Sequence, residues 1–86
     1  MQAATRPEIM EILTDIFRDV FDMPSLELHD NMTAADVDNW DSLNHINLIV
    51  SVERRFKIRF TTREVTALKN VGNLADLTQR KLGTQS

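Results

Sequence analysis

The chain has 86 residues, no cysteine and a formal net charge of −3. This length allows one small core, and an apolar fraction of 42% indicates a folded chain rather than a disordered one. The lack of cysteine excludes disulfides and thiolate metal sites. Because we find neither a bilayer-spanning apolar run nor a signal peptide, we expect a soluble, monomeric cytoplasmic protein.

The charges divide unevenly along the sequence. Residues 1–41 hold ten acidic side chains against two arginines, a net charge of −8, whereas residues 42–86 hold three acidic against eight basic side chains, a net charge of +5. An acidic first half disfavours nucleic acid as a partner, because phosphate binding needs clustered lysine and arginine. The second half contains a local basic cluster, which is either a solvated face or a surface for partner docking: Arg54, Arg55, Lys57, Arg59 and Arg63.

The first expected element is an amphipathic helix near the N-terminus. Thr5 can cap this helix and Pro7 suits its first turn. Its apolar residues recur at the spacing of one helix face: Ile9, Ile12, Leu13, Ile16, Phe17, Val20 and Phe21.

Residues 22–41 show no helical period and contain Pro24. A connection of about twenty residues is unusual in a compact domain and is often functional. We expect four apolar residues to hold this loop against the core, with room for one short helical turn: Leu26, Leu28, Met32 and Val37.

A second helix is predicted over residues 42–56, with Ser42 or Asp41 as its cap. Its apolar residues cover more than half of the circumference, which predicts a central helix packed against several neighbours. They are Leu43, Ile46, Leu48, Ile49, Val50, Val52 and Phe56.

The segment from Phe56 to Phe60 alternates apolar and charged residues. Because a single strand would have no partner, we expect an extended connector. Thr61 and Glu64 then form a capping-box pattern for a short third helix, which we expect to bury Val65 and Leu68.

The last helix is expected to begin at a cap formed by Asn70 or Asn73 and to end at Gly83, before a loose tail of residues 84–86. Its inward-facing residues are predicted to be Val71, Leu74, Leu77 and Leu82. The chain as a whole is therefore predicted to be all-α, a four-helix bundle with three longer helices and one short helix. We expect a single domain over residues 1–86, with a folded core of about residues 8–82.

Ser42 lies in the sequence Trp40-Asp41-Ser42-Leu43, directly before the apolar second helix. Three roles fit this position. Ser42 could cap the helix, it could act as a nucleophile with His45 as base, or it could be a passive attachment point for a phosphate ester. The nucleophile role lacks a Gly-x-Ser-x-Gly elbow and an oxyanion hole, whereas the start of a helix favours a phosphate.

From about Glu8 to Leu82 the sequence resembles the acyl carrier proteins. The most specific part is residues 30–43, which end in Asp41-Ser42-Leu43, and further agreement comes from Asn70-Val71-Gly72-Asn73-Leu74. The resemblance implies an acyl carrier that is not an enzyme and that holds intermediates as thioesters on a covalent 4′-phosphopantetheine at Ser42. It implies two kinds of partner: a phosphopantetheinyl transferase, and loading ligases or synthases of one pathway. The alternatives are an aminoacyl or peptidyl carrier and an unmodified helical interaction module.

The resemblance also implies residues for partner recognition: Asp41, Leu43, Ile46, Val50 and Glu53. Typical fatty-acid carriers bear several carboxylates on this helix, but here Asn44 and Asn47 are neutral and Arg54 and Arg55 are basic. We therefore expect a carrier for a specialised lipid, polyketide or related biosynthetic pathway. The surplus of apolar residues on the helix (Leu48, Val50 and Val52) would permit a sheltered cargo, although core packing explains these residues equally well.

No metal site is predicted. Asp36, Asp38 and Asp41 lack the glycine and terminal glutamate of a calcium loop, and His29 and His45 are too far apart for a zinc motif. We expect Trp40 to anchor the loop.

Overall fold

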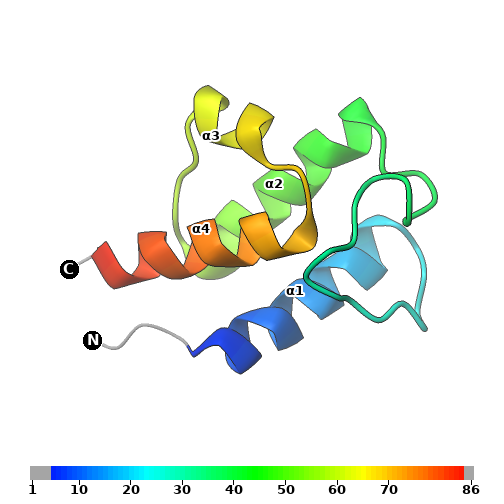
Figure 1. Cartoon of the computed structure of the whole chain (residues 1–86), viewed down its shortest axis with the longest axis horizontal. Helices are drawn as coiled ribbons and strands as arrows, with labels where there is room; N and C mark the ends of the chain where they lie inside the picture. The colour runs from blue at the N-terminus through cyan, green and yellow to red at the C-terminus, as the bar shows by residue number, and fades with distance from the viewer. Residues whose placement is uncertain (1–4, 85–86) are drawn as a thin grey trace.

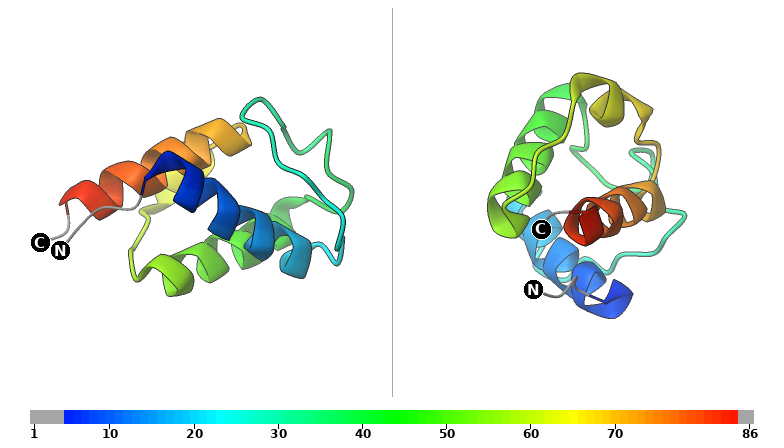
Figure 2. Two further views of the ribbon diagram at one scale, coloured as in Figure 1. Left: turned by 90° about the horizontal axis from the view of Figure 1, so that it is seen from below. Right: turned by 90° about the vertical axis from the view of Figure 1, so that its left-hand side faces the viewer.

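The computed structural model describes residues 5–84, which form four helices. In chain order they are α1 (Arg6–Val20), α2 (Ser42–Phe56), α3 (Thr62–Ala67) and α4 (Val71–Thr84). No strand occurs among these residues, so the all-α prediction is confirmed. α1 contacts both α2 and α4, and α3 lies on the opposite side of the bundle from α1 (Figures 1 and 2).

α1 begins with the cap that its sequence predicts. The Glu8 N–H donates to the Thr5 hydroxyl, and the Thr5 N–H donates to the Glu8 carboxylate at 2.9 Å. The predicted apolar face is buried or half-buried and forms the centre of the core together with α2, α4, the loop and the connector. Fully enclosed large side chains of this core are Ile9, Leu13, Phe17, Val37, Leu48, Val52, Val71 and Leu74.

The loop between α1 and α2 is held against α4 by backbone hydrogen bonds. Val71 N–H donates to the Met32 carbonyl at 2.9 Å, and Gly72 N–H donates to the Asp30 carbonyl at 2.7 Å. A Cβ atom at Gly72 would lie only 2.9 Å from the Asp30 oxygen, so the close approach requires glycine. Arg6 adds ion pairs to Asp30 (3.1 Å) and to Asp76 on α4.

The apolar loop residues pack as expected. Val37 is buried, and Leu26, Leu28 and Met32 are half-buried against the core. The loop runs through hydrogen-bonded turns, without a helix (Figure 1). These inward-facing side chains fix the long loop to the core, although most of its other residues are exposed.

α2 has the predicted bounds, but one inference about it is wrong. Its apolar residues do not all pack against neighbouring helices: Leu48, Ile49 and Val52 are buried, whereas Leu43, Ile46 and Val50 are exposed. Leu48 and Val52 belong to the core and Val50 faces solvent. A cargo sheltered beside these residues stays a prediction.

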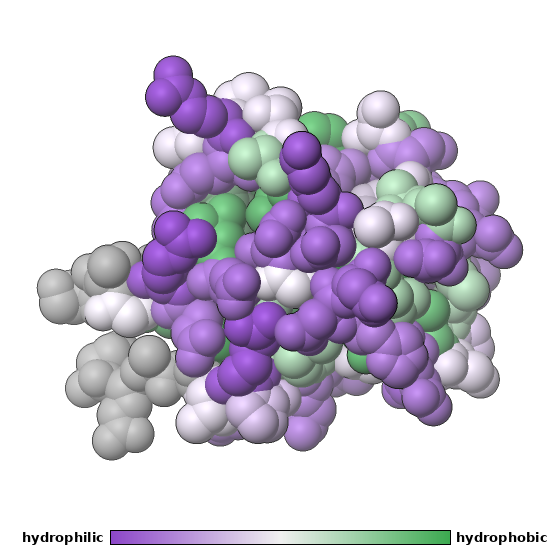
Figure 3. Space-filling view, viewed as in Figure 1, coloured by the Kyte–Doolittle hydropathy of each residue, from purple (hydrophilic) through white to green (hydrophobic). Residues whose placement is uncertain are grey.

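Two further predictions, the burial of residues in α3 and the end of α4, differ from the structure. Val65 and Leu68 are half-buried rather than buried, because α3 covers the edge of the core instead of entering it. Figure 3 shows mostly polar surface on this side, with apolar side chains visible between α3 and α4. α4 continues past Gly83 to Thr84, and the rest of the predicted tail lies outside the described residues.

The sequence left two candidates for the N-terminal cap of α4, Asn70 and Asn73, and the hydrogen bonds decide between them. The Asn70 side-chain oxygen accepts the Asn73 N–H at 2.8 Å, as an N-terminal cap does. The Asn73 side chain instead accepts the Lys69 N–H at 3.2 Å, which ties the short connection after α3 to the first turn of α4. The inward-facing prediction is confirmed for Val71, Leu74 and Leu77, while Leu82 is half-buried.

Candidate functional site

Ser42 is the first residue of α2 and its side chain is exposed. The cap of the helix is Asp41, whose carboxylate accepts the Asn44 N–H at 2.9 Å. The fold therefore does not use Ser42 as a cap, and its hydroxyl stands on the surface at a helix N-terminus. α2 has no acidic residue in its first turn, and its N-terminal N–H groups favour negative charge, although the Asp41 carboxylate already lies at this end.

Asn39 shapes the turn that leads into Ser42. It adopts a left-handed conformation with φ of 71°, which asparagine tolerates better than most residues. Its carbonyl accepts two hydrogen bonds, from Asp41 N–H (2.9 Å) and from the Asn44 side chain (2.7 Å). The serine is thus presented by a turn that is bonded to the helix on both sides.

Trp40 anchors this turn to the core, as expected from the sequence. Its ring meets Phe17 of α1 edge to face at 5.3 Å between centroids and lies 6.1 Å from the Phe21 ring. Aromatic contacts of this geometry add to simple burial. The position of Ser42 is therefore coupled to α1 through the tryptophan two residues earlier.

His45 links the same turn to α3, a role that the sequence did not reveal. The Trp40 Nε1–H donates to His45 Nδ1 at 3.0 Å, and His45 Nε2 lies 3.3 Å from the Val65 carbonyl. Because tryptophan can only donate, His45 Nδ1 must accept, and the hydrogen of the neutral ring is assigned to Nε2. Both ring nitrogens are then engaged, so His45 is not positioned to activate Ser42.

A groove of about 530 Å³ begins at Ser42 and runs between α2 and α3. Its walls are mainly apolar, and Lys69 supplies one positive charge. The remaining lining comes from the turn, the first part of α2 and α3: Ala34, Trp40, Asp41, His45, Ile46, Val65, Thr66 and Leu68. Three of these residues, Val65, Thr66 and Leu68, carried no functional signal in the sequence, because only the fold brings α3 beside Ser42.

These residues fit a phosphopantetheine. The phosphodiester needs an accessible hydroxyl and a site that tolerates negative charge, which Ser42, the helix N-terminus and Lys69 supply. The arm is slender and partly apolar, and the groove beside Ser42 has apolar walls of matching character.

The residues predicted for partner recognition have different environments. Leu43, Ile46 and Val50 are 72%, 54% and 43% exposed, and Asp41 is exposed at the cap. Glu53 is half-buried, and its carboxylate accepts the Phe60 N–H at 2.8 Å, which ties the end of α2 to the connector. Glu53 thus has a structural role, and its contact with a partner stays a prediction.

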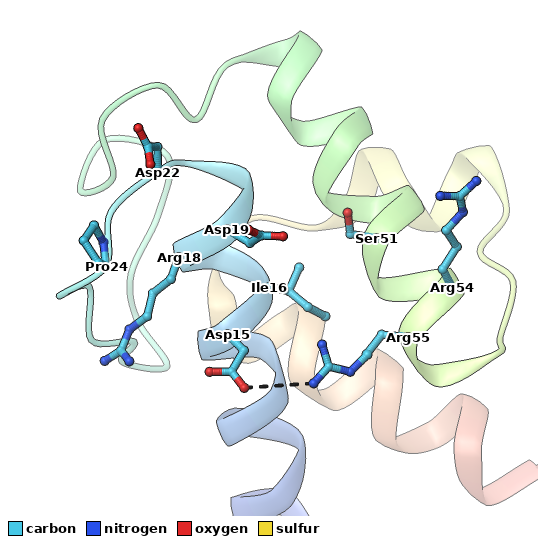
Figure 4. A pocket seen from close by; sticks show the side chains of 9 residues that line it. All are labelled: Asp15, Ile16, Arg18, Asp19, Asp22, Pro24, Ser51, Arg54 and Arg55. Carbon is cyan, nitrogen blue, oxygen red and sulfur yellow. Dashed lines mark ion pairs between the residues drawn. The ribbon is translucent and has the colours of Figure 1, made fainter.

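Another surface hollow, of about 770 Å³, lies away from Ser42 between α1 and the second half of α2. Figure 4 shows acidic side chains of α1 on one side and Arg55 of α2 reaching toward Asp15, at 4.0 Å. Within residues 5–84, no three histidine or acidic side chains converge as metal ligands. No helix in that range is long and apolar enough to cross a membrane.

Comparison with known proteins identifies the family. Residues 11–78 match the model of the phosphopantetheine attachment site family. The chain is 30% identical over 74 residues to an acyl carrier protein of Acidothermus cellulolyticus, which covers 86% of this chain and 88% of the relative.

Solved structures agree with this match. A solution NMR structure of holo acyl carrier protein from Geobacter metallireducens is 52% identical, with a TM-score of 0.82 and coverage of 87% of this chain and 86% of that chain. A putative acyl carrier protein from Mycobacterium tuberculosis has the same fold at 22% identity, with a TM-score of 0.72 over 79% of this chain and 90% of that one. The chain therefore belongs to the acyl carrier proteins, which carry a covalently attached phosphopantetheine.

Proposed function

We propose that this chain is a single cytoplasmic, monomeric carrier unit that holds acyl intermediates as thioesters on a 4′-phosphopantetheine at Ser42. The observation that supports this most is the exposed Ser42 hydroxyl at the start of α2, where Asp41 already performs the capping. When bound, the arm supplies a terminal thiol that forms thioesters. The chain supplies the attachment point, the rigid turn behind it and the groove beside it.

In this proposal the chain is not itself an enzyme. Nucleophilic serines need an adjacent base, but the ring nitrogens of His45 are bonded to Trp40 and Val65. The phosphopantetheinyl transferase would bring the base to Ser42. The rest of α2 then serves recognition by that transferase and by the enzymes that load and use the cargo, through Asp41, Leu43, Ile46 and Val50.

We also propose that the carrier serves a specialised lipid, polyketide or related pathway rather than general fatty-acid synthesis. α2 contains a single carboxylate, Glu53, which already accepts a hydrogen bond from Phe60. Asn44 and Asn47 stand where carboxylates are common in fatty-acid carriers, and their side-chain amides are bonded to Asn39 and to each other. An α2 without free carboxylates offers little to the basic surfaces that fatty-acid enzymes use.

Intact-mass spectrometry tests the attachment site. Incubation with a promiscuous phosphopantetheinyl transferase and coenzyme A should add about 340 Da, the mass of the arm. Ser42→Ala should abolish the gain, whereas Ser25→Ala, which changes an exposed serine in the loop, should keep it. Circular dichroism of each variant checks the fold. A gain that persists in Ser42→Ala, or no gain in the native chain, would contradict the proposal.

A housekeeping ketosynthase of fatty-acid synthesis tests the pathway. Once the arm is loaded with an acyl group, we expect this enzyme to use the protein with a kcat/KM about tenfold or more below that for its own carrier, because docking charge governs encounter. Equal rates for the two carriers would defeat the idea of a dedicated pathway.

A further inference from the structure

The exposed face of α2 is the apolar surface of this molecule that most needs an explanation. Within the residues whose burial the structure describes, the exposed large apolar side chains are Leu43, Ile46 and Val50, and all three lie on α2. Their spacing of three and four residues places them in one row, opposite the buried Leu48 and Val52. A contiguous apolar row that remains exposed indicates a surface that another molecule covers.

This row continues into basic residues. Arg54 follows Val50 by one helical turn, and Figure 4 shows its side chain pointing away from α1, whereas Arg55 reaches toward Asp15 of α1. Arg54, Lys57 and Arg59 line a hollow of about 460 Å³ together with Val50. We call Arg54, Lys57 and Arg59 the distal basic patch.

One acidic residue, Glu53, lines the same hollow, and its carboxylate already accepts a hydrogen bond within the chain. The Glu53 carboxylate accepts the Phe60 N–H at 2.8 Å and is half-buried. The residues that line this hollow therefore include three basic side chains and one carboxylate, which gives a net positive charge. Arg54 and Arg59 are exposed.

The opposite end of α2 has the reverse charge. Asp36, Asp38 and Asp41 are exposed in the turn that leads to Ser42. The distance from Ser42 to Arg54 along the helix is about 18 Å, at a rise of 1.5 Å per residue. From the turn before Ser42 along the exposed face of α2, the surface thus passes from acidic through apolar to basic.

From this arrangement we infer that α2 docks a pathway enzyme whose contact surface is apolar opposite Leu43, Ile46 and Val50 and acidic opposite the distal basic patch. The inference rests on the proposed function, since it assumes that the arm on Ser42 must enter that enzyme. An ordered series of charges favours one orientation of the partner and disfavours the reverse. A partner with a uniformly basic surface would meet repulsion at the far end of α2.

A charge exchange on both sides of the interface tests this inference. The probe is a purified fatty-acid ketosynthase with a basic docking surface, used with the acyl-loaded, phosphopantetheinylated carrier. We expect Arg54→Glu/Arg59→Glu to raise kcat/KM about tenfold at low salt and the gain to shrink in high salt, because screening weakens exposed charges. A ketosynthase whose docking lysines and arginines are changed to glutamate should show the opposite preference and favour the native carrier.

The matched control is Arg63→Glu/Arg80→Glu, which changes the net charge equally but on α3 and α4. We expect it to change kcat/KM by less than about twofold, since the effect depends on the position of the charge. An equal gain from this control, or no gain from the patch variant, would overturn the inference. Thermal unfolding confirms that each variant is folded.

Two further measurements distinguish a failure of the proposed function from a failure of the docking inference. Intact mass shows beforehand whether the arm is present on Ser42. A chain that the transferase leaves unmodified refutes the proposed function, whereas a fully loaded chain without charge dependence refutes only the docking inference. Light scattering tests a second copy of this chain as the occupant, and self-association that Ile46→Asp abolishes would also overturn it.

Discussion

α1 and α3 begin with the same kind of N-terminal cap, but they differ in length and in how many side chains they bury. Both start with a Thr–Glu capping box, from Thr5 to Glu8 and from Thr61 to Glu64. α1 then has fifteen residues and buries four side chains, whereas α3 has six residues and buries none. A good cap therefore starts a helix but does not anchor it, because helix stability in proteins comes mainly from a buried face.

The contacts that hold α3 are few and mostly polar. Its Val65 carbonyl lies 3.3 Å from His45 of α2, and Glu64 pairs with Lys81 of α4 at 2.8 Å. Val65 itself is half-buried against the core. Segments with few buried apolar contacts open at the lowest free energies. α3 is also one wall of the groove at Ser42, so the site has one rigid wall, formed by α2, and one weakly held wall.

The largest effect is expected from the core of α1. Phe17→Ala should lower the free energy of unfolding by about 3–5 kcal/mol, because it leaves a cavity among fully enclosed side chains. Urea denaturation followed by circular dichroism measures this loss. Val65→Ala, in the half-buried α3, should cost clearly less. Equal losses for the two variants would remove the contrast between α1 and α3.

A smaller and local effect is expected at His45. His45→Ala removes the partner of the Trp40 indole N–H and of the Val65 carbonyl, which should cost about 1–3 kcal/mol. Amide hydrogen exchange should accelerate in α3 but not in the centre of α1, and Trp40 fluorescence should change. His29→Ala, which alters an exposed loop histidine, is the matched control. Uniform acceleration over all helices would show that His45 supports the whole bundle instead.

The smallest effect concerns pH and compares the two capping boxes. The hydrogen bond from Lys81, followed by that from the Thr61 N–H, holds the pKa of Glu64 below its usual value, and the Thr5 N–H does the same for Glu8. A carboxyl with a lowered folded-state pKa stabilises the protein above its unfolded-state pKa, and the effect is lost as pH falls through the folded-state value.

Carboxyl titration by NMR, together with thermal unfolding between about pH 7 and pH 3, measures this effect. Glu64→Gln should flatten the acid limb of the stability curve while leaving the Glu8 titration unchanged. A Glu64 carboxyl that titrates at or above its usual value would contradict the prediction.

Local sequence patterns were sufficient to predict where most of the helices lie, because caps and apolar periodicity act over a few residues. The bounds of α2 and the Thr5 and Thr61 caps are local features of this kind. Burial was predicted less well: Val65 and Leu68 have the spacing of core residues, yet α3 covers only the edge of the core. A periodic pattern identifies an apolar face but not how deeply that face is buried.

In the candidate site, too, the sequence predicted the features that depend on neighbouring residues and missed those that depend on distant ones. Ser42 stood out from its neighbours in sequence and from the resemblance that they carry, and the family comparison supports a carrier. The sequence suggested His45 only as a possible base and did not reveal its link to α3, because its partners include Val65, twenty residues further along the chain. The sequence also left open whether Ser42 or Asp41 caps α2, which the hydrogen bond from Asn44 N–H to Asp41 decides.

By itself, the sequence determined an all-α chain with four helices and a serine at the start of the second, because these depend on neighbouring residues. Only the tertiary structure decided that Leu43, Ile46 and Val50 remain exposed while Leu48 and Val52 are buried. It also decided that Gly72 must admit the backbone of Asp30. These outcomes depend on which distant segments meet, and the packing of α1, α4 and the long loop selects the face of α2 that stays exposed.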